Sequence, residues 1–169
     1  MEHKNLIDIL NEVRNFMIED IDKALNLVTE DRGAPNMMLA LSLCCYTEVW
    51  GKLLNPEKKA KDRFDLFLET FGNCYKELIH HSNASIYGHI RSEFVHGFVL
   101  KQNWTLNVVI EGNGECDKCG ILFDAKNKIY TFCVRRYFED FKTAVDRSIP
   151  KLTSSGEVIL RTRKALNIK

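Results

Sequence analysis

The sequence lacks the features that mark membrane and secreted proteins. No uninterrupted apolar run approaches the roughly 20 residues that a membrane-spanning helix requires. The first ten residues contain Glu2 and Asp8 and no apolar stretch of the kind that a secretory signal carries. We therefore expect a cytoplasmic protein without a membrane partner.

Net charge is also almost absent. The chain has 24 Lys and Arg against 23 Asp and Glu, a formal net charge of +1. Domains that hold nucleic acid by bulk electrostatics are strongly basic, so any contact with RNA would have to come from a local site. The one dense basic stretch, with Arg161, Arg163 and Lys164, is more typical of a solvated helix face.

What remains is an ordinary globular composition. The 169 residues are 45% hydrophobic and 28% charged, without repeats or low-complexity tracts. A chain of this length forms one domain with its own core. We therefore expect residues 1–169 to form a single domain.

Hydrophobic periodicity predicts a mostly helical fold. Apolar residues recur at helical spacing over about 4–28, 36–54, 64–79, 84–100 and 138–149, with Pro150 ending the last of these. A short helix from about residue 157 follows. Residues 104–110, 120–123 and 128–133 are strand-like, and the last two flank a turn at 124–127. We expect a helical bundle, about 4–100 and 134–150, with a small hairpin or three-strand insertion at about 104–133.

The helix at 84–100 carries the most informative pattern. At 100° per residue, one face holds Ile and Phe residues and another holds small residues that allow a neighbouring helix to approach closely. Arg91 and His96 flank this small-residue seam, about 140° apart. Glu48, an acid within the apolar helix at 36–54, needs a partner if it is buried, and we expect that partner to be Arg91.

An arginine and a histidine at such a seam suit phosphodiester chemistry. Histidine exchanges a proton near neutral pH, and arginine binds a phosphate through a bidentate fork. Together they suffice for cleavage of RNA by the neighbouring ribose 2′-hydroxyl without a metal. Two copies packed along the seam would place both pairs of residues in one cleft.

The stretch Arg91-Ser92-Glu93-Phe94-Val95-His96 resembles the R-x4-6-H motif of the HEPN superfamily of helical-bundle proteins. The resemblance is to members from toxin–antitoxin and abortive-infection systems. It implies a metal-independent ribonuclease, without a cofactor, that forms a homodimer through the helix at 84–100. His96 would be the general acid and base, Arg91 the phosphate clamp, Glu48 the orienting acid and Ser92 a minor polar helper. Active members commonly have Asn, Asp or His where this chain has Ser92.

Alternatives remain open for the same residues. Arg91 and Glu48 can form a purely structural ion pair, in a non-catalytic HEPN module that binds a nucleotide or a protein such as a nucleotidyltransferase-type antitoxin. His89, Glu93 and His96 lie on one side of the predicted helix and can bind a divalent metal. We rate this metal site below the ribonuclease site, because no further ligand is evident.

Six cysteines raise a separate question. In a cytoplasmic chain we expect reduced thiols, with Cys44, Cys45 and Cys74 as structural cysteines. The Cys116-x2-Cys119 pair has zinc-ligand spacing, and the hairpin returns Cys133 near Cys119. This gives a third hypothesis, a zinc-stabilised interaction protein. There is no second C-x2-C and no fourth ligand, so we favour a turn with two incidental thiols.

Overall fold

The computed structural model describes residues 5–28, 34–81, 86–91, 105–112 and 114–168. Over these residues the chain is mostly helical, with a small mixed sheet of three strands. This confirms the predicted fold class at the level of a helical protein with a β insertion.

The first helix, α1 (Leu6–Leu27), begins where Asn5 accepts a hydrogen bond from the backbone N–H of Ile7, 3.4 Å away. Such a cap satisfies one of the free N–H groups at a helix start. The predicted apolar stripe forms its inner face, with these residues buried: Leu6, Leu10, Met17, Ile21 and Leu25.

The second helix, α2 (Ala34–Leu54), is the central one and contacts α1, α3, α6, α7 and β1. The helix predicted from about residue 36 starts slightly earlier, and Pro35 lies in its first turn, where its missing N–H costs nothing. Pro35–Leu54 is long and apolar enough to cross a membrane by length and composition alone. Its charged residues, such as Glu48, interrupt the apolar run, so the run itself is shorter. Its buried side chains, such as Leu43 and Trp50, pack against other helices.

The predicted third helix is interrupted. The structure has α3 (Ala60–Leu68), a 3-10 turn η1 (Glu69–Phe71) and α4 (Asn73–His80). The break falls at Gly72, whose φ of 151° is a conformation that side chains with a Cβ rarely adopt. Continuous apolar spacing concealed this break, because both short helices turn their apolar faces to the same core.

The sheet has the strand order β1-β3-β2. β1 (Thr105–Val109) is parallel to β3 (Ile129–Cys133), and β2 (Ile121–Asp124) is antiparallel to it. Asp124 Oδ1 accepts hydrogen bonds from the N–H groups of Lys126 and Asn127, both at 3.0 Å, and so closes the predicted hairpin turn.

β3 leads directly into α6 (Val134–Leu152), and α7 (Gly156–Ala165) follows. Pro150 does not end α6 as predicted, because the helix continues to Leu152. A proline this near the C-terminus removes one hydrogen bond, and the last turn tolerates its loss because few bonds remain. Ser155 accepts a hydrogen bond from the N–H of Val158 and caps α7.

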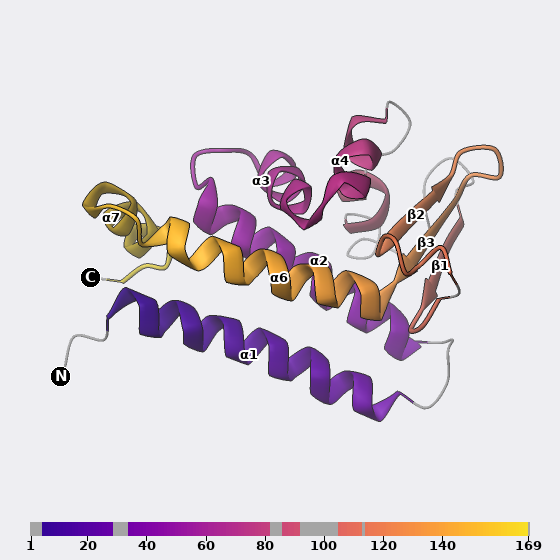
Figure 1. Cartoon of the computed structure of the whole chain (residues 1–169), viewed down its shortest axis with the longest axis horizontal. Coiled ribbons are helices and arrows are strands. Elements are labelled where there is room, and N and C mark those ends of the chain that lie inside the picture. Colours follow the sequence, from indigo (N-terminus) through magenta and orange to yellow (C-terminus); the bar gives the residue numbers. More distant parts are fainter. Residues whose placement is uncertain (1–4, 29–33, 82–85, 92–104, 113, 169) are drawn as a thin grey trace.

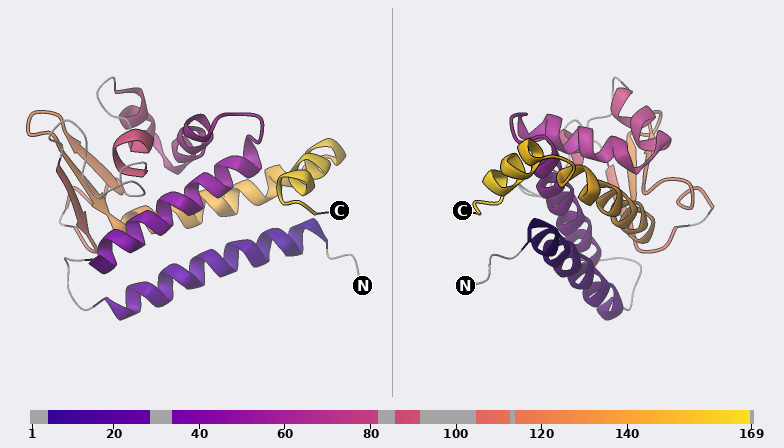
Figure 2. Two further views of the ribbon diagram at one scale, coloured as in Figure 1. Left: turned by 180° about the vertical axis from the view of Figure 1, so that it is seen from behind. Right: turned by 60° about the vertical axis from the view of Figure 1, so that its left-hand side comes forward.

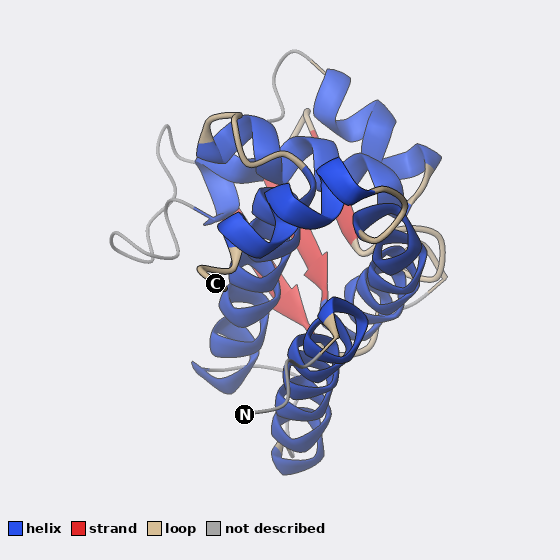
Figure 3. Cartoon of the chain, turned by 90° about the vertical axis from the view of Figure 1, so that its left-hand side faces the viewer, coloured by secondary structure: helices blue, strands red, loops and turns tan. Residues whose placement is uncertain are grey.

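Long helices run the length of an elongated molecule, and the sheet lies at one of its ends (Figure 1). α1, α2 and α6 run along its length, with α3 and α4 on one side of α2 and α6 and α1 on the other (Figure 1). The sheet lies at one end and α7 at the other, as the further views also show (Figure 2). Seen along the long axis, the helices stand in front of the strands (Figure 3).

Candidate functional site

Glu48 of α2 and Arg91 form an ion pair, with 2.6 Å between Glu48 Oε2 and Arg91 Nη2. The Arg91 side chain is 21% exposed and that of Glu48 is 23% exposed, so the pair lies at the edge of the core. The guanidinium carbon also lies 5.5 Å from the centre of the Tyr87 ring, within cation–π range. The structure therefore brings together two of the four residues of the predicted site.

The ion pair leaves part of the guanidinium available. Arg91 Nε is buried and has no hydrogen-bond partner among the described residues. A guanidinium carries five N–H donors in a planar fork that matches a phosphate. Arg91 is thus held on one side by Glu48, and within the described part of the chain no acceptor engages its Nε.

Cysteines on the same stretch of α2 are not nucleophiles. Burial raises the pKa of Cys45, although the positive charge of Arg91 partly opposes the shift. Burial also raises the pKa of Cys44, which is completely buried, far above its ordinary value. Both thiols therefore stay protonated near neutral pH, and neither supplies a reactive thiolate.

The backbone at Arg91 differs from the predicted α-helix. Tyr87–Arg91 forms a π-helical turn, η2. Hydrogen bonds from i to i+5 widen the turn, so the assumed 100° per residue does not apply to η2. The angular separation predicted between Arg91 and His96 depends on residues 92–96, which lie outside the described residues, and it stays a prediction.

His89 contacts the sheet. Its Nδ1 lies 2.9 Å from the hydroxyl of Tyr130 on β3, and the two rings meet edge to face. One ring nitrogen of His89 is therefore engaged by a tyrosine. Among the described residues, no group of three or more His, Cys, Asp or Glu side chains is placed to hold a metal ion.

The other predicted residues of this segment, Ser92, Glu93 and His96, lie outside the described residues. The small-residue seam beyond Arg91, and with it the predicted dimer contact, lies there too. Their roles stay predictions from the sequence.

Four of the six cysteines form two disulfides, Cys74–Cys119 and Cys116–Cys133. The expectation that all thiols are reduced is therefore wrong for this form of the protein. Cys74 is also not an isolated structural cysteine, because α4 brings it to the C-x2-C turn. In this form Cys116, Cys119 and Cys133, the predicted zinc ligands, are bonded as disulfides.

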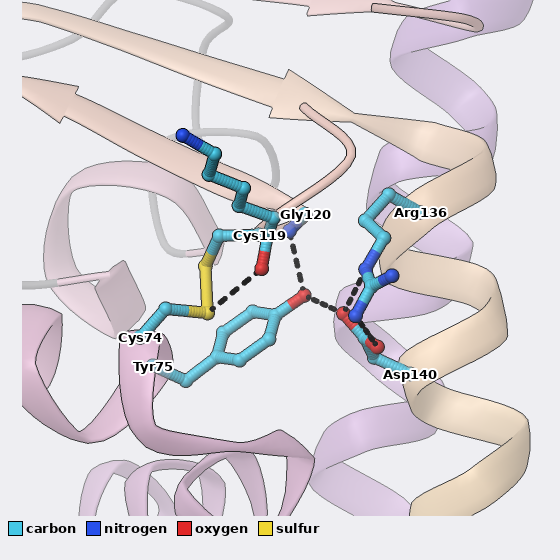
Figure 4. Close-up of a disulfide and its surroundings, with 7 residues drawn as sticks. Cys74, Tyr75, Cys119, Gly120, Arg136 and Asp140 are labelled. Atoms are coloured by element: carbon cyan, nitrogen blue, oxygen red, sulfur yellow. Dashed lines mark hydrogen bonds and ion pairs between the residues drawn. A yellow bond between two sulfur atoms is a disulfide. The ribbon is translucent and has the colours of Figure 1, made fainter. Parts of the chain in front are cut away.

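A buried polar cluster lies beside the first disulfide (Figure 4). The Tyr75 hydroxyl donates to Asp140 Oδ2, 2.7 Å away, and accepts from the backbone N–H of Gly120 at 2.8 Å. Arg136 holds the same carboxylate, with Nη2 2.8 Å from Oδ1. Burial and the Asp140 charge raise the pKa of Tyr75 well above its ordinary value, so this hydroxyl keeps its proton.

A second polar contact crosses the core between α2 and α6. The hydroxyls of Thr47 and Tyr137 lie 2.8 Å apart, and Thr47 also donates to the carbonyl of Leu43. Sequence reasoning missed both clusters. The sequence signal for the first cluster was Asp140, an acid that falls between Tyr137 and Phe141 on the apolar face of α6 and therefore needs a partner.

The fold and these sites define a class: a mostly helical protein with a small disulfide-linked sheet and a partly buried Arg–Glu pair. Compared with known proteins, the chain matches no family model, no curated protein and no solved structure. Its function is therefore argued from its own residues.

Proposed function

We propose that this chain is a HEPN-like, metal-independent endoribonuclease that acts as a homodimer. The observation that carries the proposal is the Arg91–Glu48 ion pair, 2.6 Å long, beside the R-x4-H sequence. An arginine that is held on one side by a carboxylate and keeps part of its side chain exposed suits the binding of a phosphate.

In the proposed reaction, Arg91 binds the scissile phosphate and stabilises the charge that develops on it. His96 accepts the proton of the ribose 2′-hydroxyl, whose oxygen forms a new bond to phosphorus. The bond from phosphorus to the 5′-oxygen breaks, and protonated His96 gives its proton to the 5′-oxygen. The products are a 2′,3′-cyclic phosphate and a 5′-hydroxyl. Glu48 is a positioning residue, and Ser92 is a polar neighbour of the phosphate site.

The experiment is cleavage of mixed cellular RNA by the disulfide-bonded protein in the presence of a chelator. We expect wild-type protein to cleave and both His96→Ala and Arg91→Ala to lose at least about 100-fold in rate, the scale of a lost acid–base or charge-stabilising group. The matched control is His80→Ala, because His80 is exposed at the end of α4. It should cleave as wild type does.

Glu48 has its own test, because it acts through Arg91. We expect Glu48→Gln to slow cleavage, and the double variant with Arg91→Ala to be no slower than Arg91→Ala alone. Residues that work as a unit show this non-additivity. Additive losses would contradict the positioning role.

Absence of cleavage by wild-type protein would contradict the proposal and favour a non-catalytic module that binds a nucleotide or an antitoxin-like protein. The ion pair would then have a structural role only. A monomer at micromolar concentration in sedimentation would contradict the dimer.

A further inference from the structure

We propose that the Cys74–Cys119 disulfide is a thiol–disulfide exchange site for a small peptide-like thiol, whereas Cys116–Cys133 is a structural crosslink. Cys74 forms the mixed disulfide with the small thiol. Cys119 is the resolving thiol, which closes the crosslink again. The two disulfides differ in exposure, in surroundings and in what holds the chain together when they open.

The first difference is access. Cys74 and Cys119 line an open hollow of about 610 Å³, a size typical of small-molecule sites. Cys74 is partly exposed, whereas Cys116 is 4% exposed and Cys133 is 1% exposed. Neither of these two is among the described residues that line the hollow. A thiolate must reach a disulfide sulfur to exchange with it, so the second crosslink reacts only after local opening of the fold.

The hollow also offers groups that can bind a small polar molecule. Asn107 of β1 and Leu122 of β2 are both register partners of Thr131 on β3, so the three side chains stand on one face of the sheet. All three line the hollow together with the crosslink. An amide and a hydroxyl beside an apolar side chain suit the polar backbone of a peptide-like thiol.

The two sulfurs of the crosslink are not equivalent. Cys119 is 4% exposed and Cys74 is partly exposed, so an incoming thiolate meets Cys74 first. Cys74 is also the second residue of α4. The partial positive charge at a helix N-terminus stabilises a thiolate in the first turn. Cys74 is therefore the sulfur that is attacked, and it is a good leaving group when a second thiol completes the reduction.

The exchange balances in atoms and electrons. The sulfur of the small thiolate forms a bond to Cys74 Sγ, the bond to Cys119 Sγ breaks, and Cys119 leaves with the electron pair and takes a proton from water. In the reverse step the Cys119 thiolate attacks Cys74 Sγ and expels the small thiol. A second small thiolate can instead attack the sulfur of the first. Cys74 then leaves as a thiolate, and two small thiols have become one disulfide by giving up two electrons.

A buried hydrogen bond backs up this crosslink (Figure 4). Tyr75 directly follows Cys74, Gly120 directly follows Cys119, and the N–H of Gly120 donates to the Tyr75 hydroxyl at 2.8 Å. The same hydroxyl donates to Asp140 of α6. When the crosslink opens, the turn thus stays joined to α4 and α6. We expect the fold to survive exchange at this site.

The test uses the full disulfide-bonded wild-type chain and reduced glutathione. At each time point free thiols are blocked with N-ethylmaleimide, and the peptides are mapped by mass spectrometry. We expect Cys74–Cys119 to open at least about 10-fold faster than Cys116–Cys133, with glutathione attached to Cys74. In concentrated urea the difference should disappear, because both crosslinks are then exposed. Far-UV circular dichroism should stay unchanged while only the first crosslink opens.

A matched pair of variants separates the two sulfur environments. Cys119→Ser leaves Cys74 without its resolving thiol, so the adduct of Cys74 with glutathione should accumulate. Cys133→Ser is the control, because it leaves the thiol of Cys116, which is 4% exposed. Cys116 should react at least about 10-fold more slowly. If either variant does not fold, the time course of the wild-type protein still decides.

Two results would overturn the site. One is opening of Cys74–Cys119 in the native wild-type protein that is no faster than opening of Cys116–Cys133. The other is glutathione attached to Cys119 in place of Cys74. Neither measurement involves RNA, so this proposal and the proposed ribonuclease fail separately.

Discussion

One oxygen atom, the hydroxyl of Tyr75, joins three parts of the chain. It links α4 to Asp140 of α6 and to the backbone of Gly120 at the start of the hairpin. Tyr75 is fully buried and Asp140 is 8% exposed, so neither group can exchange its partner for bulk water. Removing this oxygen would leave the N–H of Gly120 without this acceptor and would take one hydrogen bond from Asp140, whose carboxylate would keep only Arg136 among the contacts described here.

We therefore expect Tyr75→Phe to lower the free energy of unfolding by about 1–3 kcal/mol, the cost of leaving buried polar groups unsatisfied. Urea unfolding followed by circular dichroism measures it. Tyr46→Phe is the matched control, because its hydroxyl bonds only to Asp20, at 2.6 Å, on an exposed part of the surface. Equal losses in the two variants would contradict a special role for the buried cluster.

Arg91 is the residue on which the proposed function depends. Its contact with Glu48 follows from charge, since an acid within an apolar helix requires a compensating cation. The sequence contains 24 Lys and Arg residues, and charge alone does not say which of them pairs with Glu48. The fold decided it by placing η2 against α2.

At the scale of elements, the hairpin meets α6 with little room between them. A Cβ on Gly120 would lie 2.5 Å from Cα of Tyr137 and 2.5 Å from the Tyr75 hydroxyl oxygen. The backbone of α6 cannot move away from the added Cβ unless the whole helix shifts. Gly120 is therefore required for the close approach of the turn to α6.

We expect Gly120→Ala to lower the free energy of unfolding by about 1–3 kcal/mol, as overpacking does. The control is Gly156→Ala at the start of α7, where nothing lies within 4 Å of the added Cβ. That variant should be neutral or slightly stabilising, because alanine favours helix. Thermal unfolding of the two variants makes the comparison. If Gly120→Ala leaves the free energy of unfolding unchanged, the turn can move away from α6 and the expectation is wrong.

At the scale of the whole molecule, the disulfides tie the helical part to the sheet. Cys74–Cys119 spans 45 residues and Cys116–Cys133 spans 17. Loop-closure entropy assigns about 4 kcal/mol to the longer crosslink and about 3 kcal/mol to the shorter. Much of the molecule's stability in this form thus depends on the state of four sulfurs.

Reduction should therefore shift the urea midpoint to lower concentration by a large fraction of its value. Urea titrations of the oxidised and the reduced protein make the comparison. Identical midpoints for the oxidised and reduced chains would contradict the stabilising role of the crosslinks.

Local patterns were enough to predict most of the elements. Helical spacing predicted α1, α2 and α6, and alternation with turn residues predicted the hairpin of β2 and β3, because both signals depend on near neighbours along the chain. The break at Gly72 was missed because two short helices share one apolar face. Pro150 was misread because a proline near a helix end costs too little to stop it.

By itself, then, the sequence determined a mostly helical chain with a β insertion, since hydrophobic periodicity is a local property. Only the tertiary structure decided that β1 lies parallel to β3, that Tyr75 reaches Asp140, and that Cys74 meets the C-x2-C turn. These contacts join residues 24 to 65 positions apart. No spacing rule spans such distances, because the packing of whole helices against the sheet sets them.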